Sequence, residues 1–187
     1  MSKPEVWLRG PVEGVPPLLQ PAAHSLLQCR EELEEALTGL TAEQIWAPRD
    51  GSASIGYHVR HAAGSLDRLY TYARGAMLSE AQFAVLRQES QPDSSLEAVD
   101  LLAAFDAAVE RAIDQLRSTD ERTLTDERHV GRGGCRQPSS GCCFTAPSIR
   151  SVTPGRWRRW SRCSDQLKFH SQLLPPASHL PPPNSNS

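Results

Sequence analysis

The sequence predicts an all-α protein built as an up-down helical bundle, and three observations favour this class. Apolar residues recur every three or four positions through most of residues 1–133, where no alternation typical of a β-strand occurs. Capping residues and glycines divide this pattern into segments joined by short connections. Three long amphipathic segments result. Because up-down bundles more often contain four helices, a fourth is expected to start near Gly134, but the sequence shows it as missing or degraded.

The first long helix is predicted over residues 18–38. Glutamates occupy one side of it and apolar residues the other, as in a helix that covers a core. Two prolines precede it and Gly39 follows it, which is typical of helix starts and ends. The predicted inward face consists of Leu19, Ala23, Leu26, Leu33 and Leu37. A capping box at residues 41–44 then predicts a short turn that runs through Trp46.

The second long helix is predicted from about Ser54 to Arg74, and Gly75 ends it. Its inward face consists of Ile55, Val59, Ala62, Leu66, Leu69 and Ala73. His58 and His61 lie three residues apart, and therefore on one side of this helix.

The remaining helical elements follow from two further capping signals. A capping box at residues 79–82 predicts a short helix that continues to about Glu89. A cap at residues 94–97 predicts a third long helix that ends at about Arg117. Its predicted inward face consists of Leu102, Phe105, Val109, Ile113 and Leu116.

The composition of the chain changes abruptly along its length. Residues 1–133 carry 13 Lys+Arg against 21 Asp+Glu, whereas residues 134–187 carry 7 Lys+Arg against Asp165 alone. The second segment is rich in Ser, Pro, Arg and Cys and has no sustained apolar period. We therefore divide the chain into an N-terminal extension (1–14), a helical bundle (15–133) and a tail that is disordered or read out of frame.

The sequence also indicates a cytoplasmic protein. Its N-terminus lacks the basic and then apolar pattern of a signal peptide. No stretch approaches 18 consecutive apolar residues, so no membrane span is expected. Five cysteines, an odd number in a chain without a signal sequence, do not suggest a disulfide framework.

His58 and His61 are the candidate metal ligands. Imidazole is the commonest side-chain ligand of metals, so two histidines that face a bundle interior can form part of a metal site. A buried histidine satisfied by hydrogen bonds is the more frequent case. Helical geometry also places His58 nearer the centre of the apolar face than His61.

The segment SIGYHVRHAAGSLDRLYTYARG (residues 54–75) resembles the second helix of the DinB-like, YfiT-related superfamily. His61-Ala-Ala-Gly-Ser65 matches the family pattern H-[aliphatic]-A-[D/G]-S, so the resemblance implies His61 as a metal ligand, with His58 as its neighbour. It further implies a four-helix bundle that holds a divalent metal, zinc or nickel, on three histidines. The activity it implies is that of a metal-dependent hydrolase or thiol transferase acting on a small molecule.

The sequence departs from this family in the last helix. The family carries its other two histidines there, in a pattern close to H-x3-H-x-G-Q, whereas His129, His170 and His179 show no helical pairing. The resemblance therefore implies that the chain, as written, has lost two of three metal ligands and is inactive. A bundle without its fourth helix exposes apolar surface, so we also expect self-association as a homodimer, which is frequent in the family.

A frameshift explains the missing motif. If one base was lost near the codons of Gly134 and Cys135, the original frame joins the third base of each codon to the first two of the next. Codon degeneracy then allows the reading LLFHxAEHTQRHxGQV around residues 142–157, an amphipathic helix that contains H-x3-H-x-G-Q. We interpret residues 135–187 as an out-of-frame translation, and the DNA around codons 133–160 tests this hypothesis.

Two other interpretations remain open. In one, the protein is a non-enzymatic helical interaction module with a basic, disordered tail. The basic run Arg156-Trp-Arg-Arg-Trp160 then contacts phosphates, although a solvated run is the commoner case and nucleic acid is not the favoured partner. In the other, zinc binds to tail residues, although no C-x2-C pair is present. Those residues are Cys135, Cys142, Cys143, Cys163 and His170.

Overall fold

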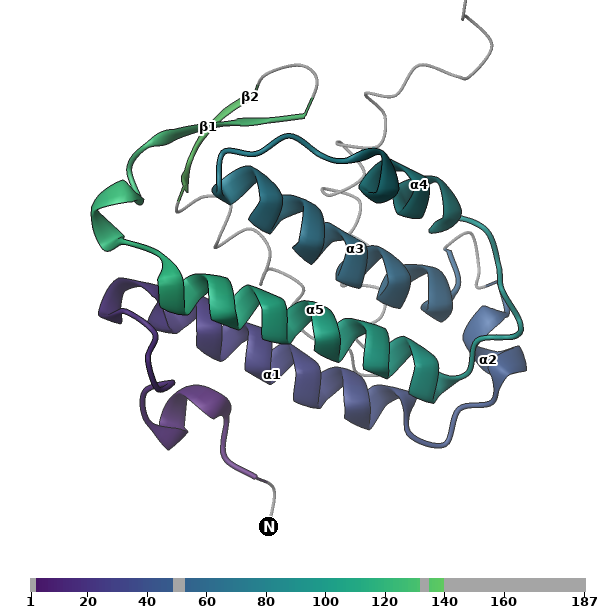
Figure 1. Cartoon of the computed structure of the whole chain (residues 1–187). Helices are drawn as coiled ribbons and strands as arrows, with labels where there is room; N and C mark the ends of the chain where they lie inside the picture. The colour runs from purple at the N-terminus through teal and green to yellow at the C-terminus, as the bar shows by residue number, and fades with distance from the viewer. Residues whose placement is uncertain (1–2, 49–52, 132–134, 140–187) are drawn as a thin grey trace, which may run out of the picture.

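The fold is a helical bundle with a small β-hairpin at one end (Figure 1). The computed structural model describes residues 3–48, 53–131 and 135–139. Three long helices form the bundle, α1 (Gln20–Leu37), α3 (Ile55–Ala73) and α5 (Ala98–Ser118). The predicted all-α bundle is confirmed, and the last residue of each long helix lies within one residue of its prediction.

Shorter elements connect the long helices. They are the helices α2 (Ala42–Trp46) and α4 (Glu80–Gln88) and the 3₁₀ turns η1 (Val6–Arg9), η2 (Pro17–Leu19) and η3 (Glu121–Thr123). Both predicted capping boxes form, because the hydroxyls of Thr41 and Ser79 accept backbone N–H groups at the starts of α2 and α4. Ser54 caps α3 in the same manner, by accepting the N–H of Tyr57 at 3.2 Å.

The start of α5 differs from its prediction. Residues 94–97 were expected to cap it, but Ser95 instead binds the Asp93 carboxylate through both its backbone N–H and its hydroxyl. The helix begins three residues later than this cap predicts, with Glu97 as the cap residue, whose N–H donates to the Asp100 carboxylate at 2.9 Å. Residues 93–95 therefore form a local turn around the Asp93 carboxylate, and the helix starts after it.

The long helices do not simply alternate in direction. Gln115 near the end of α5 donates to the carbonyl of Tyr70 near the end of α3 at 2.9 Å, so these helices are parallel. Arg117 at the end of α5 donates to the carbonyl of Glu13, just before the start of α1, so α1 runs the opposite way. The predicted up-down order holds for α1 and α3. It does not hold for α3 and α5, because residues 74–97, which include α4, return the chain along the bundle first (Figure 1).

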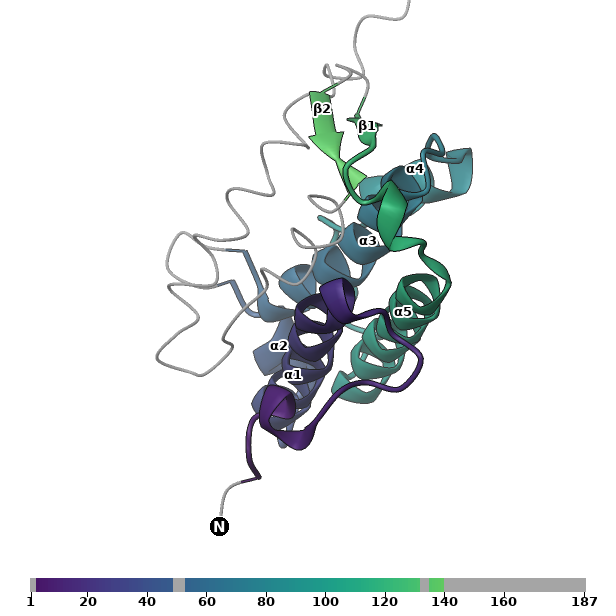
Figure 2. The ribbon, with the colours of Figure 1, turned by 90° about the vertical axis from the view of Figure 1, so that its left-hand side faces the viewer.

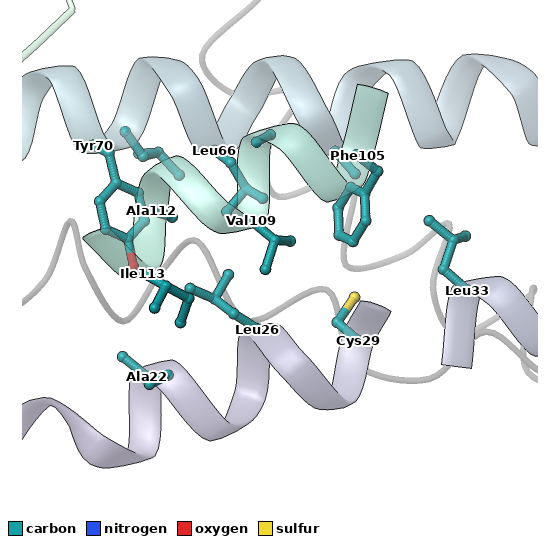
Figure 3. Close-up of a cluster of buried hydrophobic side chains, with 14 of the residues drawn as sticks. Ala22, Leu26, Cys29, Leu33, Leu66, Tyr70, Phe105, Val109, Ala112 and Ile113 are labelled. Carbon is teal, nitrogen blue, oxygen red and sulfur yellow. The ribbon is translucent and has the colours of Figure 1, made fainter. Parts of the chain in front are cut away.

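The hydrophobic core lies between the three long helices (Figure 3). Every residue predicted to face inward from α1 and α3 is buried. On α5 the buried face includes Leu101 rather than Leu102, which is only partly buried. Cys29 joins this core from α1, and burial raises the pKa of its thiol to about 12.

The N-terminal segment packs against α1, as Figures 1 and 2 show. The Glu31 carboxylate on α1 accepts from Arg9 at 2.6 Å and from Lys3 at 2.8 Å. The hydrogen bond from Arg9 and the nearby Lys3 lower the pKa of Glu31 to about 2. Val6 is buried and its N–H donates to the Gln28 side chain on α1 at 2.9 Å, so this part of the predicted extension packs against the bundle.

A two-stranded hairpin follows η3. Strands β1 (Glu127–Val130) and β2 (Cys135–Pro138) pair antiparallel, with Glu127 opposite Pro138. The prediction of no strand in residues 1–133 is therefore wrong. Strands this short carry almost no alternation, and tertiary contacts hold this one: Arg128 and Ser139 both donate to the carbonyl of Ala73, at 2.9 and 3.3 Å.

Most of the predicted tail lies outside the described residues. This applies to its predicted disorder, to the fourth-helix reading around residues 142–157, to the basic run at 156–160, and to the proposed zinc ligands beyond Cys135. These expectations remain predictions.

Candidate functional site

Both candidate histidines lie on α3, the most deeply buried helix of the bundle. His58 is 3% exposed and His61 is 5% exposed. The helical periodicity predicted that His58 lies deeper in the apolar face than His61, but the two side chains are almost equally buried. Tyr57 contacts both rings: it lies edge-on to His58, with centroids 5.2 Å apart, and stacks on His61 at 5.6 Å. The aromatic contacts restrict the orientation of both imidazoles.

His61 binds a buried glutamate from another helix. Its Nδ1–H donates to Oε2 of Glu89 at 2.7 Å, and Glu89 immediately follows the last residue of α4. Arg68, two turns after His61 on α3, donates to Oε1 of the same carboxylate at 2.5 Å. Glu89 is only 2% exposed, so its charge is matched inside the protein rather than by water.

Ser65 completes this arrangement. Its hydroxyl oxygen accepts from Arg68 at 3.2 Å and lies 3.3 Å from Nε2 of His61. In the tautomer that carries its proton on Nδ1, His61 accepts the Ser65 hydroxyl at Nε2. We refer to His61, Ser65, Arg68 and Glu89 as the polar network. Its hydrogen bonds form a closed circuit in which both imidazole nitrogens and both carboxylate oxygens have partners.

Gly64 makes room for the network. A Cβ atom at this position would lie 2.0 Å from Oε1 of Glu89 and 2.7 Å from a guanidinium nitrogen of Arg68. Only glycine lets the carboxylate approach the backbone of α3 this closely. The glycine in the His61–Ser65 motif thus has a steric role in this chain.

Polar contacts anchor α4 to the bundle at both of its ends. None of its nine residues is buried. Gln82 donates to Asp67 at 2.6 Å and to Thr71 at 2.8 Å, both on α3. The buried carboxylate of Glu89 at its end supplies the other attachment, so the polar network fixes the position of α4.

A partly open groove of about 390 Å³ lies beside the network, between α3, α4 and α5. Arg68 and Glu89 contribute to its lining, and further arginines come from α3 and α5. The groove therefore borders the candidate site.

The described residues do not fit a three-histidine metal centre. Within residues 3–48, 53–131 and 135–139, no group of three or more His, Cys, Asp or Glu side chains is placed to hold an ion. His61 is the candidate that lies in a polar cluster, with Nδ1 bound to Glu89 at 2.7 Å and Nε2 at 3.3 Å from the Ser65 hydroxyl. His129, on β1, is not buried.

Sequence reasoning identified His61 and the Ser65 position of its motif but missed Arg68 and Glu89. A partial signal existed, because residues 61, 65 and 68 follow the spacing of one helix face. Glu89 had none, since a single acidic residue at the end of a short helix looks like any solvated glutamate. Glu89 reaches His61 only because residues 74–79 turn the chain back, so that α4 lies against α3.

In the part of the chain that the structure describes, no helix combines the length and apolarity needed to cross a membrane.

Comparison with known proteins agrees with the architecture. The profile of the DinB superfamily matches residues 25–138. The crystal structure of a DinB-like protein from Bacillus cereus ATCC 10987 superposes with a TM-score of 0.53. The match covers 84% of this chain and 95% of that one, at 14% sequence identity, and so supports a shared fold. No curated protein sequence matches the chain.

Proposed function

The chain belongs to the DinB superfamily, and from this premise we propose that, as written, it is a member without the metal-dependent activity expected of a complete site. The observation that carries this proposal is that the described residues supply no group of three metal ligands at His61. The bond from Nδ1 to Glu89 fixes the His61 ring and leaves Nε2 with the 3.3 Å contact to Ser65. Histidines that bind metals commonly donate their other N–H to a carboxylate in the same way.

The chemistry of the available ligands supports the proposal that this chain does not hold a catalytic metal. Catalytic zinc sites use three protein ligands, and the described residues offer His61 and the neighbouring Glu89 carboxylate. Glu89 already neutralises Arg68, so an ion that took this carboxylate would leave a buried guanidinium without its partner. Breaking a buried pair in this way costs about 3–5 kcal/mol, which weakens any ion held there.

His58 does not complete the set. It is buried on the same helix, but no described carboxylate, cysteine or histidine forms a cluster of three with it and His61. Hydrolase or thiol-transferase chemistry, with zinc or nickel, would require the two histidines of the missing H-x3-H-x-G-Q motif. We therefore do not propose either reaction for this chain as written.

Metal analysis of the purified full-length chain tests the proposal. After incubation with zinc or nickel and removal of free ions, we expect far less than one bound ion per chain by mass spectrometry. The His61→Ala variant should show the same low content, and so should His129→Ala, which removes an exposed imidazole.

One tightly held ion per chain that disappears in His61→Ala would contradict the proposal. An ion that persists in His61→Ala would favour the tail residues as ligands instead, and chelation should then unfold the protein. The two results therefore distinguish a site on α3 from one formed by the tail.

A further inference from the structure

We propose that the groove between α3, α4 and α5 binds a small organic carboxylate with an aliphatic body. Its volume of about 390 Å³ lies within the range of about 300–1,000 Å³ that is usual for small-molecule sites. The inference rests on the groove alone and does not depend on whether the chain holds a metal.

Two arginines supply the groove with donors for an anion. Arg111 on α5 is exposed and makes no hydrogen bond or ion pair with any residue in the described ranges. Arg60 on α3 uses one nitrogen to bind the carbonyl of Gln91 at 3.0 Å. A guanidinium has five N–H donors in a planar fork that matches a carboxylate, so both side chains retain capacity for a ligand.

The charges around the groove favour an anion. Arg68 and Glu89 line it but neutralise each other, at 2.5 Å. Asp67 also lines it, and its carboxylate accepts from Gln82 at 2.6 Å, which reduces its repulsion of a ligand. Among the lining residues, Arg60 and Arg111 then outweigh Asp67 and leave one positive charge in excess, although Asp93, outside the lining, also attracts Arg60.

The rest of the lining favours an apolar body over a bare inorganic ion. Ala63, Val85 and Ala104 line the groove from α3, α4 and α5. Their small side chains leave space along the helices and provide no hydrogen-bond donors. The first turn of α4 also lines the groove, at Ala81 and Gln82, but the Gln82 N–H donates to the Ser79 hydroxyl at 3.2 Å, so this helix start is partly capped by its own chain.

Side-chain nuclear magnetic resonance of the full-length protein tests the proposal with butyrate as the probe. We expect butyrate to shift the Nε–H signals of Arg60 and Arg111 in a saturable way. Inorganic phosphate, which has the charge alone, and n-butanol, which has the chain alone, should each bind more weakly.

Three variants separate the groove from general charge. Arg111→Gln should weaken butyrate binding by about tenfold, the loss expected for a hydrogen bond to a charged group. Ala104→Leu should abolish binding by filling the groove without changing any charge. Arg87→Gln removes an exposed arginine of α4 that does not line the groove, so it should retain the affinity.

The absence of a saturable shift with butyrate would overturn the proposal. Equal weakening by Arg87→Gln and Arg111→Gln would do so as well, because it would indicate nonspecific attraction. Unchanged binding in Ala104→Leu would exclude the groove, and phosphate binding as tight as butyrate would exclude the aliphatic class of ligand. Each variant changes an exposed position, and circular dichroism verifies that each retains the helical fold.

Discussion

At the scale of single residues, the site depends on a glycine and a glutamate that meet across two helices. The Glu89 carboxylate reaches His61 and Arg68 only because Gly64 has no side chain. The bond to Glu89 fixes the His61 ring, whose Nε2 lies 3.3 Å from the Ser65 hydroxyl. The histidine of the family motif is thus held by a carboxylate that the motif itself does not contain.

Replacement of Gly64 by alanine tests this steric role. The new methyl group would collide with Oε1 of Glu89, and we expect Gly64→Ala to destabilise the protein by about 1–3 kcal/mol, as overpacking does. Chemical denaturation measures the change. In an exposed helix the same substitution would stabilise by about 1 kcal/mol, so the sign itself is informative.

A double-mutant cycle supplies the control. In the Glu89→Ala background the carboxylate is absent, so the cost of Gly64→Ala should largely vanish. An equal cost in both backgrounds would show that the methyl group collides with something other than the network.

At the scale of elements, α4 differs from the other helices in how it is attached. The long helices bury apolar faces, whereas α4 buries no residue and relies on Gln82 and Glu89. Such an element has few apolar contacts to lose and can open without unfolding the bundle. The polar network is therefore the main tether of α4.

Hydrogen exchange of Glu89→Ala measures this tether. Removal of the carboxylate leaves His61 and Arg68 buried without their partner, a loss of about 3–5 kcal/mol for a buried pair. We expect amides of α4 to exchange much faster in this variant, and more so than amides in the middle of α1. Glu80→Ala, which changes an exposed acid on α4, should leave the exchange of both helices unaltered. Unchanged protection of α4 in Glu89→Ala would show that other contacts hold it.

The connections between elements were less predictable than the elements. Capping boxes at Thr41 and Ser79 formed as expected because they depend on neighbours in the chain. The hairpin of β1 and β2 was missed because its position depends on the carbonyl of Ala73, more than fifty residues earlier. The parallel direction of α3 and α5 likewise follows from the path of residues 74–97.

At the scale of the whole molecule, the described part holds three long helices of a family that is expected to use four. The family match and the pairing of β1 with β2 both continue to residue 138 in the present reading frame. We therefore expect a lost base, if the frameshift hypothesis holds, between codons 138 and 142 rather than at Gly134.

Restoration of that base is the test for the complete protein. The restored chain should carry H-x3-H-x-G-Q and bind about one divalent ion, because three imidazoles satisfy a catalytic zinc site. Its melting temperature should then fall on addition of a chelator, since an ion that binds only the folded state stabilises it. His61→Ala in the restored chain is the control and should remove this sensitivity. A DNA sequence in which one added base does not open the expected frame would contradict the hypothesis.

The sequence by itself determined the helices, most of their caps and inward faces, and the family, because these depend on periodicity and on residues close together in the chain. It also identified His61, which lies in a local motif. Only the tertiary structure decided what His61 binds, since Glu89 lies 28 residues away and approaches through a gap left by Gly64. The physical reason is that a buried charge must be paired, and the partner available in space is set by the path of the chain.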